Sequence, residues 1–233
     1  RRIVDLVGAI DACIDALETQ IEATRTARAG VLAELLSTPG DDWQTTVVEE
    51  CCDILDRQRR PISSKERASR PGNVPYYGAA GQAGWIDEAI FNEPLVLLGE
   101  DAIDFASPTS KKAYSISGPS WVNNHAHVLR PRKQILDCLM LELLLNDVDY
   151  TNYAVFGTRS KLTQASMKKI KVSLPPLSEQ RRIVDLVGAI DTCIDALEVQ
   201  VEADRIARAG VLAELLSGEH RLPESYDKFV EAS

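Results

Sequence analysis

The sequence lacks two motifs by which enzymes hold nucleotides and cofactors. It contains no phosphate-binding loop with a lysine, and no adenosylmethionine-type glycine loop followed by a Pro-Pro-aromatic tetrapeptide. It also lacks an apolar run near the ~20 residues that a membrane-spanning helix needs. These absences argue against a catalytic chain and against a membrane protein, and we expect no cofactor.

Cysteine is sparse, and its spacing provides no disulfide framework. No C-x-x-C pair occurs among Cys13, Cys51, Cys52, Cys138 and Cys193. Free thiols of this kind indicate a reduced, cytoplasmic compartment. The chain begins with Arg1-Arg2, which is neither a signal peptide nor an initiator methionine, so we expect the cut end of a longer protein.

The most informative feature of the sequence is a repeat. Residues 1–37 return as residues 181–217, at a constant offset of 180. The copies differ only at Ala12/Thr192, Thr19/Val199, Ile21/Val201, Thr24/Asp204 and Thr26/Ile206. Two copies are too few for a solenoid, which needs about three stacked units. We interpret them as two matching helices that bracket one domain.

Apolar residues in each copy are spaced alternately three and four apart, which is the period of a coiled-coil seam. The seam positions are Ile3, Val7, Ile10, Ile14, Leu17 and Ile21 in the first copy, and Ile183, Val187, Ile190, Ile194, Leu197 and Val201 in the second. Polar residues interrupt both seams at matching steps, namely Thr24 and Arg28, and Asp204 and Arg208. Each helix would be ~55 Å long.

The ends of the two helices are also marked in the sequence. Pro39 and Gly40 end the first helix, whereas Pro175-Pro176 precedes the second, with Ser178 as its expected cap. We expect the helices to pair antiparallel. The alternative is two separate amphipathic helices packed on the surface of the domain.

Charge is distributed unevenly along the chain. The net charge is −9, yet residues 38–180 carry 16 basic and 18 acidic residues, so most of the excess lies in the helices and tail. Residues 57–70, which we call the basic segment, hold six arginines and lysines and the single acid Glu66. The sequence therefore predicts an uncompensated cationic loop within an acidic protein.

Between the repeats, short strand-like runs outnumber helical ones. Strands are predicted at residues 85–86, 89–91, 95–99, 114–117, 121–129 and 170–174, with tight turns at residues 74–81. One helix is predicted at residues 135–145, a strand or short helix at 45–55, and polar loops at 57–72 and 157–164. This mixture indicates an α+β domain flanked by two long helices.

Six stretches follow one another in a distinctive order: Arg60-Pro61-Ile62-Ser63-Ser64, Val74-Pro75-Tyr76-Tyr77-Gly78-Ala79, Leu98-Gly99-Glu100-Asp101, WVNNHAHVL at 121–129, Lys161-Leu162-Thr163-Gln164 and LPPLSEQRRIV at 174–184. Each is weak alone. Together they resemble the specificity (S) subunit of Type I restriction-modification systems, and the resemblance covers residues 1 to about 217.

The resemblance implies a target recognition domain that reads one half of a bipartite DNA site. It also implies long helices that hold methyltransferase (M) subunits and, through them, restriction (R) subunits. The expected bounds are a spacer helix at 1–40, the target recognition domain at 41–177, a second spacer helix at 178–217 and a tail at 218–233. A full subunit has two recognition domains, so we expect a missing first domain or a homodimer.

Double-stranded DNA is the expected ligand of the domain. Guanidinium groups can fork onto a phosphate or a guanine edge, although a solvated loop is the plain alternative. The residues predicted to contact DNA are Arg57, Arg59, Arg60, Ser63, Ser64, Lys65, Arg67, Arg70, Tyr76, Tyr77, Arg159 and Lys161. For the two tyrosines, packing between strand and turn is an equal alternative.

Two other motifs predict no site. His125 and His127 have a spacing found in metal ligands, but no carboxylate or cysteine lies in sequence reach, so we interpret them as a hydrogen-bonded structural cluster and expect no metal. Glu100-Asp101 lacks a partner nucleophile, and we expect no catalytic residue.

A rival function for the whole chain is a coiled-coil scaffold whose middle domain binds a protein. Sequence-selective DNA binding would exclude this alternative.

Overall fold

The computed structural model describes residues 2–157 and 160–217, with side chains from residue 5 onward. The chain forms two compact units. One comprises the two long helices, as far as Glu34 and from Leu186, and the other spans Leu35–Asp185. Among the described residues, no helix is both long enough and apolar enough to cross a membrane.

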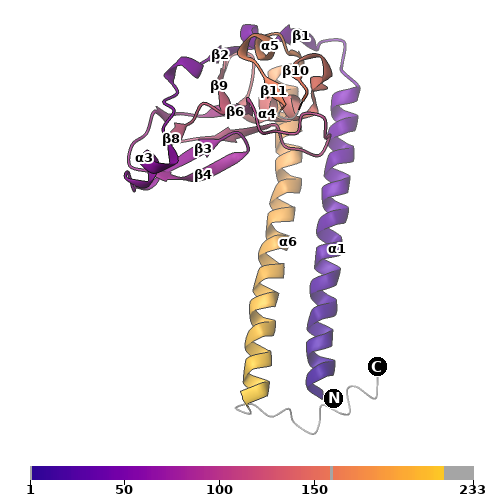
Figure 1. Cartoon of the computed structure of the whole chain (residues 1–233). Coiled ribbons are helices and arrows are strands. Elements are labelled where there is room, and N and C mark those ends of the chain that lie inside the picture. Colours follow the sequence, from indigo (N-terminus) through magenta and orange to yellow (C-terminus); the bar gives the residue numbers. More distant parts are fainter. Residues whose placement is uncertain (1, 158–159, 218–233) are drawn as a thin grey trace. The chain divides into compact units, whose positions relative to one another are not determined.

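The first unit is a pair of long helices, α1 (Arg2–Ser37) and α6 (Leu177–Ser217), which run side by side in opposite directions (Figure 1). Their seam is a cluster of the buried residues Ile14, Ile21, Ile194 and Val201, with Ile10, Leu17, Ile190 and Leu197 packed against it. Each residue has its repeat equivalent in the same cluster. The predicted antiparallel coiled coil is confirmed. The side chain of Ile3 lies outside the described residues.

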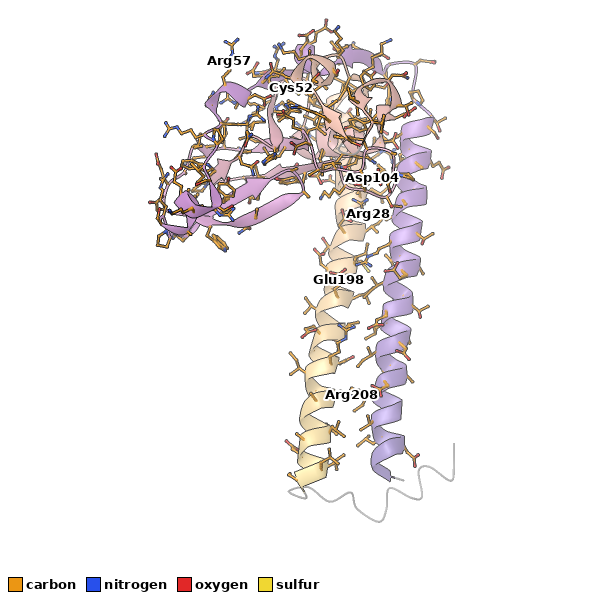
Figure 2. The ribbon with its side chains drawn as sticks, viewed as in Figure 1. Arg28, Cys52, Arg57, Asp104, Glu198 and Arg208 are labelled. Atoms are coloured by element: carbon orange, nitrogen blue, oxygen red, sulfur yellow. The ribbon has the colours of Figure 1, made fainter. Side chains whose placement is uncertain are left out.

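Ion pairs occupy the polar interruptions of this seam. Arg28 Nη2 donates to Asp191 Oδ2 over 2.9 Å, and Arg208 Nη2 donates to Asp11 Oδ2 over 2.9 Å. These are one interaction made twice, because Arg208 and Asp191 are the repeat equivalents of Arg28 and Asp11. The ion pairs Arg25–Glu198 and Arg205–Glu18 are likewise repeat equivalents of each other. Figure 2 shows Arg28 and Arg208 between the helices. The matched pairs relate the two helices by a local two-fold axis.

The start of α6 differs from the prediction. The helix begins at Leu177, and the carbonyl of Pro176 accepts hydrogen bonds from the backbone N–H groups of Glu179 and Gln180, each over 2.9 Å. Ser178 therefore lies inside the first turn and does not cap it. The end of α1 at Ser37, two residues before Pro39, agrees with the prediction.

Over its described residues, the second unit contains two four-stranded sheets and two strand pairs. The first sheet is antiparallel, in the order β2 (Cys52–Ile54), β9 (Ala126–Pro131), β6 (Leu95–Gly99) and β7 (Ala113–Ile116). The second has the order β4 (Gly81–Ile86), β3 (Val74–Gly78), β8 (Pro119–Val122) and β5 (Phe91–Asn92), with β3 and β8 parallel. The pairs are β1 (Gln44–Val47) with β12 (Lys171–Leu174), and β10 (Ala154–Val155) with β11 (Lys161–Leu162).

The core explains why these strands form. Every residue of β6 is buried, as its continuous apolar run requires of an inner strand. Helix α4 (Cys138–Asp147) covers this sheet and starts three residues later than predicted, because the Asp137 carboxylate caps it. Leu139, in the first turn of this helix, is 51% exposed. The α+β class predicted for this domain is confirmed.

Short helices lie within regions predicted as loops or left undecided. Helices α3 (Ser64–Ala68) and α5 (Gln164–Lys168) are capped by the hydroxyls of Ser63 and Thr163, which accept from the N–H groups of Glu66 and Ser166. Further short turns are α2 (Val48–Cys51), η1 (Asp56–Gln58) and η2 (Tyr150–Asn152). The predicted strand 121–129 is divided into β8 and β9 by a turn in which Asn123 Oδ1 accepts from His125 N.

Candidate nucleic-acid interface

The basic segment leaves η1, forms α3 and ends before β3, and its arginines have different surroundings. Arg59 is the most enclosed, with a side chain 14% exposed. Its Nη1 donates to Glu100 Oε2 over 3.0 Å and to the Ala126 carbonyl over 2.7 Å, and its Nε donates to the Asp56 carbonyl over 3.0 Å. Arg59 therefore ties the start of the basic segment to the first sheet.

Arg59 belongs to a polar cluster with Asp56, Glu100, His127 and Gln164, which we call the Asp56 network and in which Asp56 and His127 are buried. Asp56 Oδ2 lies 2.7 Å from His127 Nδ1 and accepts from Gln164 Nε2 over 2.8 Å, while Oδ1 accepts from Val128 N over 2.8 Å. Burial raises the pKa of Asp56, but these hydrogen bonds outweigh it and leave the pKa below its ordinary value. The network is held mainly by interactions between distant parts of the sequence.

Arg67 and Arg70 lie over aromatic rings. The Arg67 Cζ atom is 4.7 Å from the centre of the Tyr76 ring, and the Arg70 Cζ atom is 5.0 Å from that of Trp121. Such stacking fixes the plane of a guanidinium group while its edge stays available to a ligand. Arg70 also pairs with Asp87 (2.7 Å) and Glu88 (2.8 Å).

A glycine permits the pairing of Arg70. A Cβ atom on Gly72 would lie 2.3 Å from the Cα atom of Asp87, closer than any side chain allows. The chain can therefore pass directly beside the turn that carries Asp87 and Glu88. Arg60 reaches the same turn, with Nη1 3.5 Å from Glu88 Oε1, but remains 64% exposed.

The prediction of an uncompensated cationic loop is therefore wrong for Arg59, Arg60 and Arg70. Their carboxylate partners lie far along the chain and are brought in by folding. In contrast, Arg57, Lys65 and Arg67 have no carboxylate partner within the described part of the chain. Figure 2 shows Arg57 pointing away from the ribbon. These three cations, with the exposed Arg60, form the part of the segment available to an anionic ligand.

The remaining predicted contacts are not all brought to this surface. Tyr76 is buried, and Tyr77 is half-buried with its ring 6.0 Å from that of Tyr114, so the packing alternative describes both. Ser63 serves as the α3 cap, and both Ser63 and Ser64 are exposed. Lys161 lies on β11 with Nζ 3.5 Å from Glu100 Oε1. Arg159 lies outside the described residues.

A second basic surface was missed at the sequence level. Lys168, Lys169 and Lys171 lie at the end of α5 and the start of β12, and within residues 2–157 and 160–217 none pairs with a carboxylate. Gln164, at the start of α5, bonds to Asp56, which connects α5 to the η1 turn that carries Arg57. The run Lys-Lys-Ile-Lys was the signal available in the sequence.

The histidines are held by hydrogen bonds. His127 is buried, with Nε2 3.0 Å from the Leu162 carbonyl oxygen as well as its contact with Asp56. His125 is half-exposed, with Nδ1 2.9 Å from Asp101 Oδ1. No group of three or more potential metal ligands is found among the described residues.

A cavity of about 600 Å³ lies elsewhere in the same unit. Its charged lining includes Arg130, which holds Glu93 through two hydrogen bonds of 2.6 and 2.7 Å and so keeps the pKa of Glu93 below its usual value. None of the predicted DNA contacts that the structure describes lines this cavity. The basic segment is therefore a separate surface.

Known proteins are similar to this chain in sequence and in fold. A family model, the Type I restriction modification DNA specificity domain, matches residues 40–203. A Haemophilus influenzae protein assigned as a type I restriction enzyme specificity subunit is 30% identical over 162 residues, which are 68% of this chain and 40% of that protein.

Two solved structures have the same fold. The S subunit of a Type-I restriction-modification system from M. genitalium gives a TM-score of 0.66 at 16% identity, covering 91% of this chain and 59% of that one. The HsdS subunit from Thermoanaerobacter tengcongensis gives 0.57 at 19% identity, covering 91% and 55%. The chain thus spans less than two thirds of the length of each of these relatives. It belongs to the Type I restriction modification DNA specificity domain family.

Proposed function

We propose that this chain recognises one half of a bipartite DNA sequence and directs methyltransferase subunits to it. The observation that carries the proposal is family membership over residues 40–203, which include the whole basic segment. The chain itself would be non-catalytic and need no cofactor. Its described cysteines form no disulfide, which suits work in the reducing cytoplasm.

The basic segment supplies the groups that such recognition needs. Arg67 is the strongest candidate for a base contact, because its guanidinium group is oriented by Tyr76 and has no carboxylate partner among the described residues. A planar, oriented fork matches the O6 and N7 atoms of guanine in the major groove. Arg57, Arg60 and Lys65 are exposed and suit phosphate contacts, which position a protein without reading sequence.

Lys168, Lys169 and Lys171 extend the phosphate-binding surface in this proposal. Neutralising backbone phosphates releases condensed counterions, and each neutralised phosphate steepens the salt dependence of binding. A chain with net charge −9 needs such local concentrations of cations to approach DNA at all. The acidic helices, in contrast, are poor surfaces for DNA.

The helices would bind the methyltransferase subunits and, through them, restriction subunits. Opposite its seam, α6 carries a second heptad series of exposed residues, which comprises Ala189, Thr192, Ala196, Val199, Ala203, Ile206 and Gly210. Val199 is 70% and Ile206 65% exposed. Small and apolar side chains in this spacing are more favourably buried against a partner helix than exposed to water.

The local two-fold axis of the helices suggests how a complete bipartite site is read. The domain of this chain is inserted between the two helices in the sequence, and a second recognition domain, from another segment or a second copy of this chain, would be related to it by that axis. Half-sites separated by helices ~55 Å long would lie more than one ~34 Å turn of DNA apart. A homodimer would then read an inverted repeat interrupted by unspecified base pairs.

Selection from random duplexes tests the proposal. The chain, reconstituted with its methyltransferase subunits, should enrich one bipartite motif from a random-sequence pool, and its affinity should fall steeply as salt rises. Retention of DNA without enrichment of any motif, or no retention at low salt, would contradict sequence recognition. The latter result would favour a scaffold that binds protein.

A further inference from the structure

The second sheet has an edge strand that meets the basic segment. β4 is the outermost strand in the order β4-β3-β8-β5, and Figure 1 shows α3 beside β3 and β4. Arg67 of α3 lies against this strand, because a Cβ atom on Gly84 would be 3.7 Å from the Cζ and Nε atoms of Arg67. The register partner of Gly84 on β3 is Tyr76, over whose ring the same guanidinium group is stacked. β4 therefore adjoins the group proposed to read a guanine.

The shape of β4 suits contact with a ligand better than pairing with another strand. Gly81 has φ +132° and Gly84 has φ +148°, conformations that other residues rarely adopt, and the register with β3 shifts at Tyr76/Tyr77. Such a bulge interrupts the even spacing of N–H and C=O groups that an added strand would need. Beyond its chain neighbours, a Cβ atom on Gly81 would meet no described heavy atom within 4 Å. A ligand can therefore approach this strand closely.

Gln82 is the side chain of β4 best equipped to meet such a ligand. It is exposed, and its Nε2 donates to the Gly84 carbonyl oxygen over 3.2 Å. A side-chain amide has two N–H donors and one acceptor oxygen. The bond to Gly84 thus uses one donor and leaves the other N–H group and Oε1 for a ligand. It also restricts rotation of the amide, which reduces the entropy lost on binding.

A donor beside an acceptor on one amide complements adenine. In the major groove, adenine presents the acceptor N7 beside the N6 amino donor, and glutamine can bond to both. Guanine presents two acceptors there, whereas cytosine and thymine each present one hydrogen-bonding group. Adenine is therefore the base that matches both remaining groups of Gln82.

We propose that β4 is a base-reading strand, in which Gln82 reads an A·T pair close to the guanine read by Arg67. The inference rests on the proposed function and names a specificity-determining residue within it. Gln82 and Arg67 both lie against Gly84, and stacked bases repeat every ~3.4 Å, so the two positions lie within about two base pairs of each other. The major groove is wide enough for a two-stranded ribbon such as β3 and β4.

The test is selection of bound duplexes from a random pool by the full chain complexed with its methyltransferase subunits. Wild type should select a half-site that contains an A·T pair, and Gln82→Ala should accept any pair at that one position. In competition, wild type should prefer A·T there by about ten- to a hundredfold, and the variant by less than about threefold. Because Gln82 is exposed, the substitution leaves the packing of the sheet unchanged.

A second variant should change the selected base. Glutamate accepts a hydrogen bond from cytosine N4 but has no donor for adenine N7, so Gln82→Glu should select cytosine in place of that adenine. Gln134→Glu is the matched control, because Gln134 is exposed and lines the cavity that is separate from the basic segment. The control adds the same charge and should leave the motif unchanged.

Three results would overturn the inference and leave the proposed function intact. They are an unchanged motif for Gln82→Ala, relaxation at a position where wild type selects another pair, and equal weakening on selected and random DNA. The position relaxed by Arg67→Lys should lie within about two base pairs of that relaxed by Gln82→Ala. A larger separation, or no position relaxed by Arg67→Lys, would contradict a shared reading surface. If the wild-type complex selects no sequence, the proposed function and the reading role both fail.

Discussion

Arginine serves two different purposes in the two units. In the helical pair, Arg28 and Arg208 bond to Asp191 and Asp11, and each interaction is reproduced by the repeat. In the domain, Arg59 is enclosed, Arg67 is stacked on a ring and Arg57 is exposed. The helices thus use arginine as a repeated component of a seam, whereas the basic segment divides its arginines between holding the fold and facing a ligand.

The difference shows why a count of cations does not predict a binding surface. A guanidinium group with an internal carboxylate contributes to folding, and its removal leaves that carboxylate buried and unpaired. One without an internal partner is available to phosphate or base. Experiments that treat the arginines of the basic segment alike would therefore mix two effects.

The largest expected effect is on the free energy of unfolding, and it distinguishes Arg59 from Arg57. Arg59→Met should lower the free energy of unfolding of the domain by about 3–5 kcal/mol, because Glu100 and Asp56 lose an enclosed partner. Arg57→Met should change it by less than ~0.5 kcal/mol. Urea denaturation followed by fluorescence measures both. Equal effects would show that the Asp56 network does not support the fold as described.

The second prediction tests the two-fold symmetry of the helices. Ile14 and Ile194 are repeat equivalents, each 7% exposed in the same cluster. Ile14→Ala and Ile194→Ala should each destabilise the helical pair by about 2–3 kcal/mol, and by amounts equal within ~0.5 kcal/mol. Helicity measured against temperature reports the loss. Clearly unequal losses would mean that the two positions are not equivalent.

The third prediction concerns Arg67 as a base-reading residue. Arg67→Lys keeps the charge but loses the fork and the stacking on Tyr76, so the selected duplex should bind about 1–3 kcal/mol more weakly. Random competitor DNA should bind almost as before. Weakening by the same factor on both DNAs would instead make Arg67 a phosphate-binding residue.

The smallest effect is expected from the lysines. Replacement of Lys168, Lys169 and Lys171 by glutamine should weaken binding to all DNA sequences equally, and should reduce the salt slope by about 0.9 for each phosphate that is no longer neutralised. Glutamine at the exposed Lys111 is a matched control, because Lys111 pairs with Glu142. An unchanged slope would remove the lysines from the interface.

The helices were predictable because their information is local and periodic. A heptad series shows its seam wherever it occurs, and the single domain inserted between the two copies favoured an antiparallel pair. Helix α3 was also detectable, since Ser63 followed by Glu66 is a capping box, but its proline- and serine-rich surroundings favoured a loop. Short elements are decided by such caps more than by composition.

The partners of the basic segment could not be predicted from the sequence. Arg59 meets Glu100, and Asp56 meets His127, only after β2, β6 and β9 align in one sheet. Likewise, nothing near Arg67 in the sequence indicates that Tyr76 lies beneath it. Register between distant strands fixes these pairs, and a single sequence does not specify that register.

Exchange of the domain tests the central claim most directly. Residues 41–177 would be replaced by the equivalent domain of another family member, the chain reconstituted with its methyltransferase subunits, and methylated sites mapped by sequencing. The account predicts that the methylated half-site changes to that of the donor while the subunits still assemble on the helices. An unchanged motif, or loss of assembly with both helices intact, would contradict it.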